Sequence, residues 1–308
     1  MVTGRRIDVK GHESALMKLP FSGYSIRDSP SGLRSLPSGD LCMLRDIFAE
    51  KRALITGASG GIGSCIVRRL TASGALVGLV ARRRSPLEEL QKEIIRAGGT
   101  AIVAPADVTD RAALLGAIDT VRDAWGGIDI AIACAGTYVR GEVMDSDPSI
   151  HEDQWRTSYL GTLYLFQEVI PAMLERGWGR LGLVSSVIGF KGMPRESAYA
   201  AGKAAEAGMA GILRQELHGT DVFLSTVHPS RTDTPMIAAL EVPLISRKIS
   251  PDRVARALLK GMRKKKPYVI VPSIGPRMLW AGEMLSPRLA DTIVRWFRLS
   301  GWITGEED

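Results

Sequence analysis

From residue 51 onward the chain alternates between short, nearly continuous apolar runs and longer stretches in which apolar residues recur every three or four positions. The short runs predict buried strands, and the periodic stretches predict helices that each bury one face. Strands buried on both faces and separated by helices indicate a parallel sheet with right-handed crossovers. The sequence therefore predicts an α/β fold with a single doubly wound parallel sheet of about seven strands and helices on both faces. The expected strands lie at 53–55, 75–81, 100–104, 128–133, 181–185, 222–227 and 268–271.

Two segments depart from this pattern. Residues 1–47 hold clusters of Gly, Ser and Pro without sustained periodicity, which predicts a disordered N-terminal extension. There are two alternatives for this stretch: it is a transit peptide, or translation begins at Met43. Residues 48–275 form the predicted catalytic domain, including one long helix over about 151–174. Residues 276–308 alternate apolar and aromatic residues with arginines, which predicts an amphipathic helical segment that packs on the domain, on a partner subunit or on a membrane surface.

Composition and charge exclude several classes of protein. The apolar runs are too short and too broken to span a bilayer. The 3 cysteines are scattered and odd in number, which favours a reducing, cytoplasmic compartment over a disulfide framework. The net charge of +7 is not accompanied by the interleaved basic and aromatic residues of a nucleic-acid site. We therefore expect no nucleic-acid partner and, because no Cys or His residues have metal-ligand spacing, no metal site.

A glycine-rich turn follows the first predicted strand and opens the first helix. Residues 56–63 read Thr-Gly-Ala-Ser-Gly-Gly-Ile-Gly. Glycines let the backbone approach a pyrophosphate closely, and the helix start offers free N–H groups and a positive dipole. The residues that we expect to hold a dinucleotide in this turn are Gly57, Ser59, Gly61, Ile62 and Gly63.

The end of the second strand predicts which dinucleotide is bound. An acidic residue there would hold the ribose 2′-hydroxyl of NAD, but the segment reads Arg82-Arg83-Arg84. Guanidinium groups suit phosphate oxygens, so NADP is favoured over NAD, with Arg82 and Arg83 as candidate ligands. After the third strand, the Asp107 carboxylate is placed either to accept from the adenine amino group or to cap a helix near Thr109. Small residues after the fourth strand would let the cofactor approach the sheet, and the further contacts expected at these two strand ends are Val108, Ala135 and Gly136.

The candidate catalytic residues follow the fifth strand. Tyr199 and Lys203 are four residues apart in a predicted helix, so their side chains share one face. A nearby ammonium lowers the pKa of a phenol and lets it exchange a proton with a carbonyl or carbinol oxygen. Ser186, thirteen residues before Tyr199, is placed to hold that oxygen.

In these motifs the chain resembles the short-chain dehydrogenase/reductase family from about residue 50 to 275. The resemblance implies a Rossmann-type subunit that binds a nicotinamide dinucleotide and assembles as a homodimer or homotetramer. It implies that Tyr199 is the acid/base, that Lys203 binds the nicotinamide ribose, and that Ser186 positions the substrate. The strand-end residues that match the family's further cofactor contacts are Pro229, Thr232 and Thr234.

The chain departs from the family's pattern in one strand-end segment and at one helix position, and Gly202 and Ser230 are milder replacements of the family's serine and glycine. The Asn-Asn-Ala-Gly segment reads Ala-Cys-Ala-Gly at 133–136, which removes amide hydrogen bonds to the neighbouring strand. The helix asparagine that helps to hold a proton-relay water aligns with Ser158, the possible relay position of this chain.

The predicted function is an NADP(H)-dependent oxidoreductase that transfers a hydride between the nicotinamide and a carbonyl or secondary alcohol. Apolar residues at 236–245 form either a lid over a hydrophobic substrate or a part of the core. One alternative is a non-catalytic dinucleotide-binding sensor or interaction subunit. A remote alternative is an α/β-hydrolase, because residues 57–61 also match Gly-x-Ser-x-Gly with Ser59 as nucleophile and His151, His218 or His228 downstream.

Overall fold

A computed structural model describes residues 44, 47–272 and 274–303 of the chain. The predicted N-terminal extension therefore lies almost wholly outside the described residues. Its last residues behave differently from the prediction: Leu44 and Ile47 are helical, and Leu44 is buried in the core beside Phe48.

Seven parallel strands form one sheet in the order β3-β2-β1-β4-β5-β6-β7, which confirms the predicted doubly wound fold. The strand β1 pairs in parallel with β2 on one side and with β4 on the other, so the order in which strands are added to the sheet switches from one side of β1 to the other at this point. The strands are β1 (Arg52–Thr56), β2 (Leu76–Val80), β3 (Thr100–Val103), β4 (Ile130–Ala133), β5 (Gly179–Val184), β6 (Val222–Pro229) and β7 (Tyr268–Val271).

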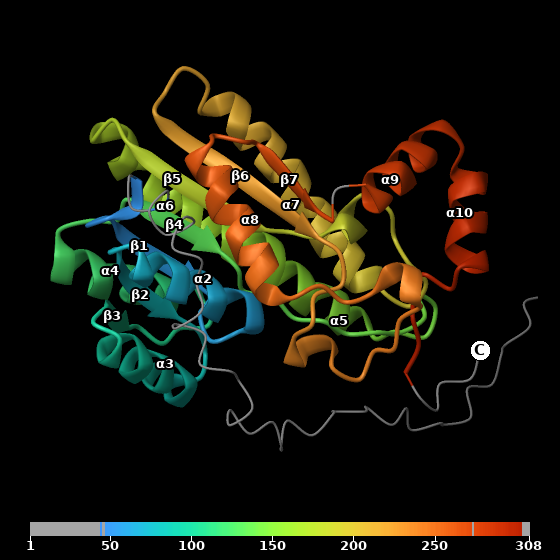
Figure 1. The fold of residues 1–308 in the computed structure, drawn as a ribbon, viewed down its shortest axis with the longest axis horizontal. Helices are drawn as coiled ribbons and strands as arrows, with labels where there is room; N and C mark the ends of the chain where they lie inside the picture. Colours follow the sequence, from blue (N-terminus) through green and yellow to red (C-terminus); the bar gives the residue numbers. More distant parts are fainter. Residues whose placement is uncertain (1–43, 45–46, 273, 304–308) are drawn as a thin grey trace, which may run out of the picture.

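Helices cover both faces of the sheet (Figure 1). The principal α-helices are α2 (Gly61–Ala72), α3 (Arg84–Arg96), α4 (Arg111–Trp125), α5 (Pro148–Trp155), α6 (Gly161–Glu175), α7 (Ser197–Glu216), α8 (Pro251–Arg263), α9 (Gly275–Leu285) and α10 (Pro287–Trp296). Short helical turns are η2 (Arg156–Leu160), η3 (Val187–Gly189), η4 (Pro235–Ile237) and η5 (Leu244–Ser246).

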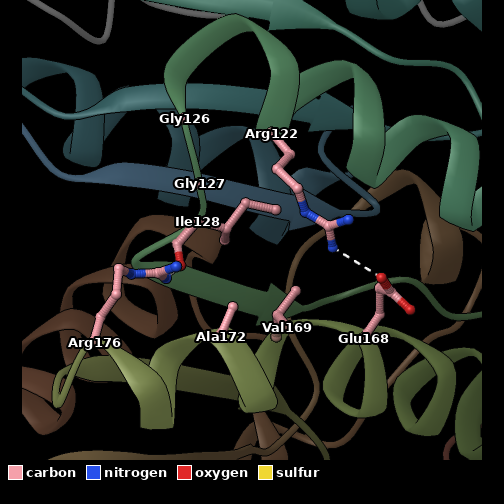
Figure 2. A pocket seen from close by; sticks show the side chains of 8 residues that line it. All are labelled: Arg122, Gly126, Gly127, Ile128, Glu168, Val169, Ala172 and Arg176. Atoms are coloured by element: carbon pink, nitrogen blue, oxygen red, sulfur yellow. Dashed lines mark hydrogen bonds and ion pairs between the residues drawn. The ribbon is translucent and has the colours of Figure 1, made fainter.

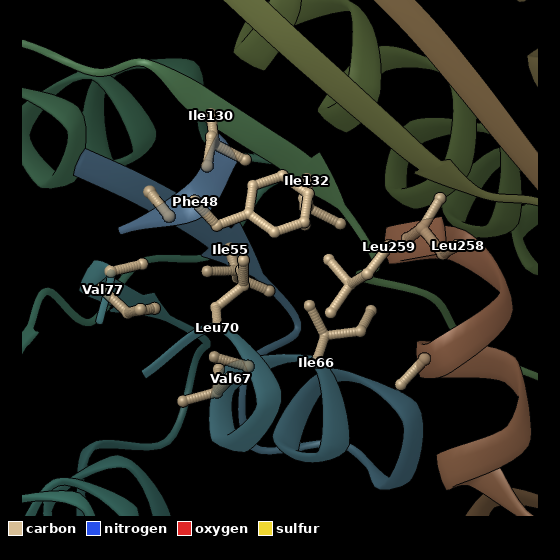
Figure 3. Packing of buried hydrophobic residues seen from close by; sticks show 14 of the residues in the cluster. Phe48, Ile55, Ile66, Val67, Leu70, Val77, Ile130, Ile132, Leu258 and Leu259 are labelled. Atoms are coloured by element: carbon tan, nitrogen blue, oxygen red, sulfur yellow. The ribbon is translucent and has the colours of Figure 1, made fainter. Parts of the chain in front are cut away.

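Two hydrophobic clusters fill the space between sheet and helices. On one face, apolar residues of α2, α3 and α8 pack on the sheet. Figure 3 shows Ile66 and Leu70 of α2 and Leu259 of α8 around Ile55 and Phe48. On the other face, α4, α6 and α7 form the second cluster. Burial of these faces is the main favourable contribution to folding, and it holds the strand ends in fixed positions.

The long helix predicted over about 151–174 is present as one continuous helical stretch over 148–175, but it is not α-helical throughout. The structure divides this stretch into α5, the π-helical turn η2 and α6. A π turn inserts an extra residue, and such turns are common at functional sites. Close packing accompanies it, because a Cβ atom on Gly161 would lie 2.8 Å from a methyl of Val108.

The C-terminal segment forms a helical hairpin of α9 and α10 at one end of the molecule (Figure 1). Lys191 anchors the hairpin by ion pairs to Glu283 at 2.7 Å and to Asp291 at 2.5 Å. Among the described residues, no helix combines the length and the hydropathy that a membrane span requires.

Candidate active site

The candidate residues lie at the carboxyl edge of the sheet, where ligands bind in open α/β folds. The glycine turn follows β1, Cys134–Gly136 follow β4, Ser186 follows β5, and Thr232 and Thr234 follow β6. The helix α7 crosses this edge and brings in Tyr199 and Lys203. Parallel strands end at the same edge, so residues far apart in the sequence meet there.

The glycine turn lies directly against the end of β4. Gly57 has φ +65°, and a Cβ atom on it would lie 2.6 Å from the Cys134 carbonyl oxygen and 2.7 Å from the Ala135 nitrogen. A Cβ atom on Gly61 would lie 2.6 Å from the Thr234 side chain, so the loop after β6 reaches the same turn. Gly60 caps α2 without a side-chain hydrogen bond, and Ser59 and Ile62 are half-buried beside it. This arrangement suits a diphosphate at the start of α2.

Thr56 links the glycine turn to β4 and was not among the predicted site residues. Its hydroxyl accepts from the Cys134 nitrogen at 3.2 Å and from the Ala135 nitrogen at 3.4 Å. These bonds hold the segment in which the family's asparagines are missing. The sequence feature that could have identified Thr56 is its hydroxyl side chain directly before the glycine turn.

The ends of β2 and β3 bring a guanidinium and a carboxylate together. Arg82 lies 3.8 Å from Asp107 in a solvent-exposed ion pair, and Arg83 is exposed beside it. Asp107 Oδ1 accepts from the Thr109 nitrogen at 2.9 Å and from its hydroxyl at 2.8 Å. These bonds are local to the turn before α4, and the N-cap of that helix is Asp110 rather than Asp107, so the capping alternative for Asp107 is wrong and its adenine contact stays a prediction. Val108 is buried, and its side chain lies against Gly161.

Ser186 and Tyr199 lie close together above the end of β5. The buried Ser186 hydroxyl donates to the Pro229 carbonyl at 3.4 Å and accepts from the Ile188 nitrogen at 3.3 Å. Burial raises the pKa of the Tyr199 phenol, whereas Lys203 and a hydrogen bond with Ser186 lower it. The structure therefore brings together the three residues proposed for the chemistry.

Lys203 is buried and extends past the Tyr199 ring. Its Nζ lies 5.9 Å from the centroid of that ring and donates to the Val184 carbonyl at 3.1 Å. A Cβ atom on Gly136 would lie 4.0 Å from Nζ, so the end of β4 also reaches the lysine. Nζ also contacts both oxygens of Glu206, each at 3.0 Å. Glu206 was not predicted, although its position three residues after Lys203 places it on the same helix face.

Ser158 lies inside the π-helical turn and is fully buried. Its hydroxyl accepts from the Gln154 amide at 2.9 Å. A Cβ atom on Gly202 would lie 3.2 Å from the Ser158 Oγ, so the turn packs against α7 next to Lys203. The position that aligns with the family's relay asparagine is thus adjacent to α7, the helix that carries Tyr199 and Lys203.

A second set of aromatic and charged groups lies next to Tyr199. Tyr138 stands edge-on to Tyr199 with ring centroids 5.2 Å apart, and its hydroxyl donates to Glu196 at 2.9 Å. Arg140 and Arg231 also bind Glu196, at 3.3 Å and 3.5 Å. This buried network joins the loops after β4 and β6 to the start of α7.

In the apolar segment at 236–245, Leu240 belongs to the core, and the lid role stays a prediction. Leu240 is buried, whereas Leu244 and Ile245 are exposed to 83% and 69%. Glu241 pairs with Trp302 through backbone hydrogen bonds in both directions, so the end of the described chain holds this segment in place.

Figure 2 shows a cavity of about 80 Å³ between α4, the loop before β4 and α6. The ion pair between Arg122 and Glu168, at 2.8 Å, lies at its edge. The cavity reaches Ile128, which precedes β4, so it lies away from the carboxyl ends of the strands and apart from the candidate site.

Comparison with known proteins identifies the family. A short chain dehydrogenase family profile matches residues 51–242. The chain therefore belongs to the short-chain dehydrogenase family and is an oxidoreductase of that family. This membership overturns the hydrolase alternative built on Ser59, and His228 contacts the Ser186 carbonyl rather than the glycine turn.

Individual relatives agree with this assignment. The chain is 34% identical over 256 residues to ketoacyl reductase HetN of Nostoc sp., covering 80% of this chain and 89% of that protein. A 3-oxoacyl-[acyl-carrier protein] reductase of Brucella melitensis with bound NAD is similar in structure, with TM-score 0.68, 26% identity, and coverage of 77% of this chain and 95% of that one. The structure of a variant of actinorhodin polyketide ketoreductase with NADPH is also similar, with TM-score 0.66 and 26% identity. The match covers 74% of this chain and 96% of the ketoreductase chain.

The buried His228 makes the stability of this region depend on pH. His228 directly precedes Pro229, and its ring is fully buried and tilted against the Phe190 ring, with the two centroids 4.4 Å apart. Burial lowers the pKa of His228 to about 4, whereas an imidazole in an unfolded chain titrates near pH 6.5. The unfolded state therefore binds more protons as the pH falls below 6.5, and the native state loses stability.

We expect the free energy of unfolding to fall by roughly 2 to 3 kcal/mol through His228 between pH 6.5 and pH 4. His228→Phe keeps a ring against Phe190 and should flatten this part of the profile, measured by urea unfolding across that range. His218→Gln, at an exposed position, is the control and should leave the profile as in the wild type. An equal slope in the His228→Phe protein would contradict the assignment.

Proposed function

We propose that the protein is an NADP(H)-dependent oxidoreductase that transfers a hydride between the nicotinamide and a carbonyl or secondary alcohol. The observation that carries the proposal is the meeting of Ser186, Tyr199 and Lys203 beside the glycine turn at the carboxyl edge of the sheet. Membership in an oxidoreductase family supports it.

The glycine turn fits the diphosphate of a dinucleotide. The closeness of Gly57 to the end of β4 leaves no room for a side chain inside the turn, and no side chain of the N-cap residue Gly60 caps the first N–H groups of α2. In this proposal a nicotinamide, when bound, supplies or accepts the hydride. The chain's proposed cofactor contacts are Gly57, Ser59, Gly61, Ile62, Gly63, Arg82, Arg83, Asp107, Val108, Ala135, Gly136, Tyr199, Lys203, Pro229, Thr232 and Thr234.

The chain's own residues handle the substrate oxygen and its proton. Ser186 donates a hydrogen bond to the oxygen and stabilises the negative charge that develops there during reduction. Tyr199 donates its proton to that oxygen, or removes the proton in the reverse direction. Lys203 holds the nicotinamide ribose and lowers the pKa of the phenol, while Ser158 marks the relay position toward solvent.

We propose a hydrophobic substrate. The exposed Met236, Leu244 and Ile245 follow the loop that carries Thr234 and supply apolar surface for an acyl chain. The relative from Nostoc sp. is a ketoacyl reductase, which supports a keto group on such a chain.

We also propose that residues 276–308 form a C-terminal unit that contacts an anionic membrane surface, with the protein otherwise cytoplasmic. Large apolar side chains are exposed on both helices of the hairpin, including Met284 at 74%, Leu285 at 87% and Trp296 at 80%. Exposed arginines are interleaved with them, and this combination complements anionic lipid. The arginines are Arg277, Arg288, Arg295 and Arg298.

A second copy of the chain is the proposed partner at another face. A groove of about 620 Å³ runs between α5, η2 and α7, and Trp155 lines it with 44% of its surface exposed. In a homodimer or homotetramer, a second copy would cover this apolar groove and bury Trp155. A monomer in sedimentation velocity would contradict the proposed assembly.

Tyr199→Phe removes the proposed proton donor without changing the shape of the ring. We expect kcat for reduction of a ketone panel to fall by about 10²-fold or more, with NADPH affinity nearly unchanged. NADPH absorbance measures the rate, and fluorescence titration measures binding. Tyr164→Phe is the matched control because Tyr164 lies on α6, away from the site. If NADPH binds but neither the wild type nor the variant reduces any ketone, the sensor alternative replaces the enzyme.

Arg82→Asp places a carboxylate where we expect the 2′-phosphate of NADP. The ratio of kcat/KM for NADPH over NADH should fall by about 10-fold or more, because charge repulsion replaces a charge-assisted hydrogen bond. Arg96→Asp makes the same charge change at the other end of α3 and should leave the ratio unchanged. An unaltered ratio in Arg82→Asp would remove the NADP preference.

The hairpin proposal predicts binding to vesicles that contain anionic lipid and little binding to vesicles of neutral lipid. The double variant Leu285→Ser, Trp296→Ser should lose several-fold in cosedimentation, because it removes apolar side chains from the proposed contact. Ile212→Ser, which changes a 60% exposed residue on α7, is the control. If the wild type and the double variant cosediment equally with anionic vesicles, the proposed membrane contact is wrong.

A further inference from the structure

Glu206 forms a buried ion pair with Lys203 at the centre of the candidate site. The two residues are three positions apart on α7, and Lys203 Nζ lies 3.0 Å from each carboxylate oxygen. The exposed fraction is 4% for the lysine side chain and 1% for the glutamate side chain. The third short contact of Nζ, at 3.1 Å, goes to the Val184 carbonyl. These contacts fix the position of the ammonium from two sides.

Stability alone does not account for this pair. Moving two charges out of water is costly, and apolar residues of similar volume in such a place are often at least as stable. The pair lies against the phenol that we propose as the proton donor, since Nζ is 5.9 Å from the Tyr199 ring centroid. This position points to a role in the chemistry.

Other titratable groups surround the pair, but Glu206 is the carboxylate in contact with the ammonium. Burial raises the pKa of Cys134 to about 12 and lowers that of His228 to about 4, so both are neutral near pH 7. Glu196 is held by arginines. By element, the facing groups are Tyr199 and Glu196 on α7, Cys134 after β4, Tyr138 in the loop that follows, and His228 on β6.

We propose that Glu206 is a positioning residue of this site: its carboxylate holds the Lys203 ammonium and offsets its charge beside Tyr199, so that the phenol keeps its proton for donation to a carbonyl oxygen. The inference rests on the proposed function and deepens it, because it assigns the site to the reductive direction. No new bond forms in this role; Glu206 acts through Lys203.

The electrostatics of the three groups agree with this role. Lys203 lowers the pKa of Tyr199, and Glu206 raises it. Burial raises the pKa of Glu206 to about 7, against the opposing effect of Lys203, so its carboxylate carries the offsetting charge above that pH, in the alkaline range where the Tyr199 phenol titrates. Removing the carboxylate leaves the charge of Lys203 unbalanced, so the phenol should lose its proton at a lower pH.

Glu206→Gln tests the proposal because the amide keeps the shape and removes the charge. Reduction requires the protonated phenol, so in Glu206→Gln the alkaline limb of the profile of kcat/KM against pH should move to lower pH by about one unit. At a fixed pH above the limb, kcat/KM should then fall roughly tenfold. Glu206→Asp retains the charge on a shorter side chain and should move the limb in the same direction by less. Glu216→Gln removes a charge from the exposed end of the same helix and should move nothing.

A second measurement separates this inference from the proposed function. Ultraviolet difference titration of the cofactor-free protein, with and without Tyr199→Phe, reports the ionisation of Tyr199 directly. The Glu206 variants should lower that transition even if no substrate is turned over, whereas an active Tyr199→Phe protein would overturn only the catalytic assignment. An unshifted tyrosine transition in both Glu206 variants would overturn the inference. If Glu206→Gln does not fold, the titration of Glu206→Asp decides.

Discussion

The close contact between the glycine turn and the end of β4 is the constraint on which the candidate site depends. Gly57 has a positive φ, and a Cβ atom added to it would lie 2.6 Å from the Cys134 carbonyl oxygen. Thr56 closes the same junction by accepting two backbone N–H groups. Because the turn is held against the sheet, α2 begins at a defined point beside β4. The start of that helix and the end of β4 then form one surface, on which the other strand ends converge.

Several buried charged groups lie where this surface meets α7. Two buried carboxylates, Glu206 and Glu196, lie on either side of Tyr199 along the chain. Glu206 is paired with Lys203, whereas Glu196 is held by Arg140, Arg231 and the Tyr138 hydroxyl. Such groups are costly to bury and hold their partners in fixed geometry. The phenol therefore lies between two rigid polar networks, one on the proposed cofactor side and one toward the loops that would receive a substrate.

The loops and the C-terminal hairpin are coupled to the same region by direct contacts. Trp280 of α9 stacks on Phe190 at 4.8 Å, and Phe190 follows the turn that begins at Ser186. Lys191, next in the chain, carries the ion pairs to both hairpin helices. A change in the position of the hairpin would therefore act on the segment directly after Ser186. This gives a physical route by which a surface contact could influence access to the site.

The sequence by itself determined the parallel sheet and the family, because apolar runs, helical periodicity and the glycine turn are local signals that can be recognised along the chain. It also singled out Ser186, Tyr199 and Lys203, which the structure brings together although their roles stay a prediction. It missed the π turn around Ser158, because a continuous helical pattern carries no sign of one inserted residue. It missed Thr56 and Glu206 as site residues, and only the tertiary structure decided their partners. The role of a hydroxyl or carboxylate cannot be told from the sequence alone, because it depends on which ammonium or backbone N–H the buried group meets in the folded structure.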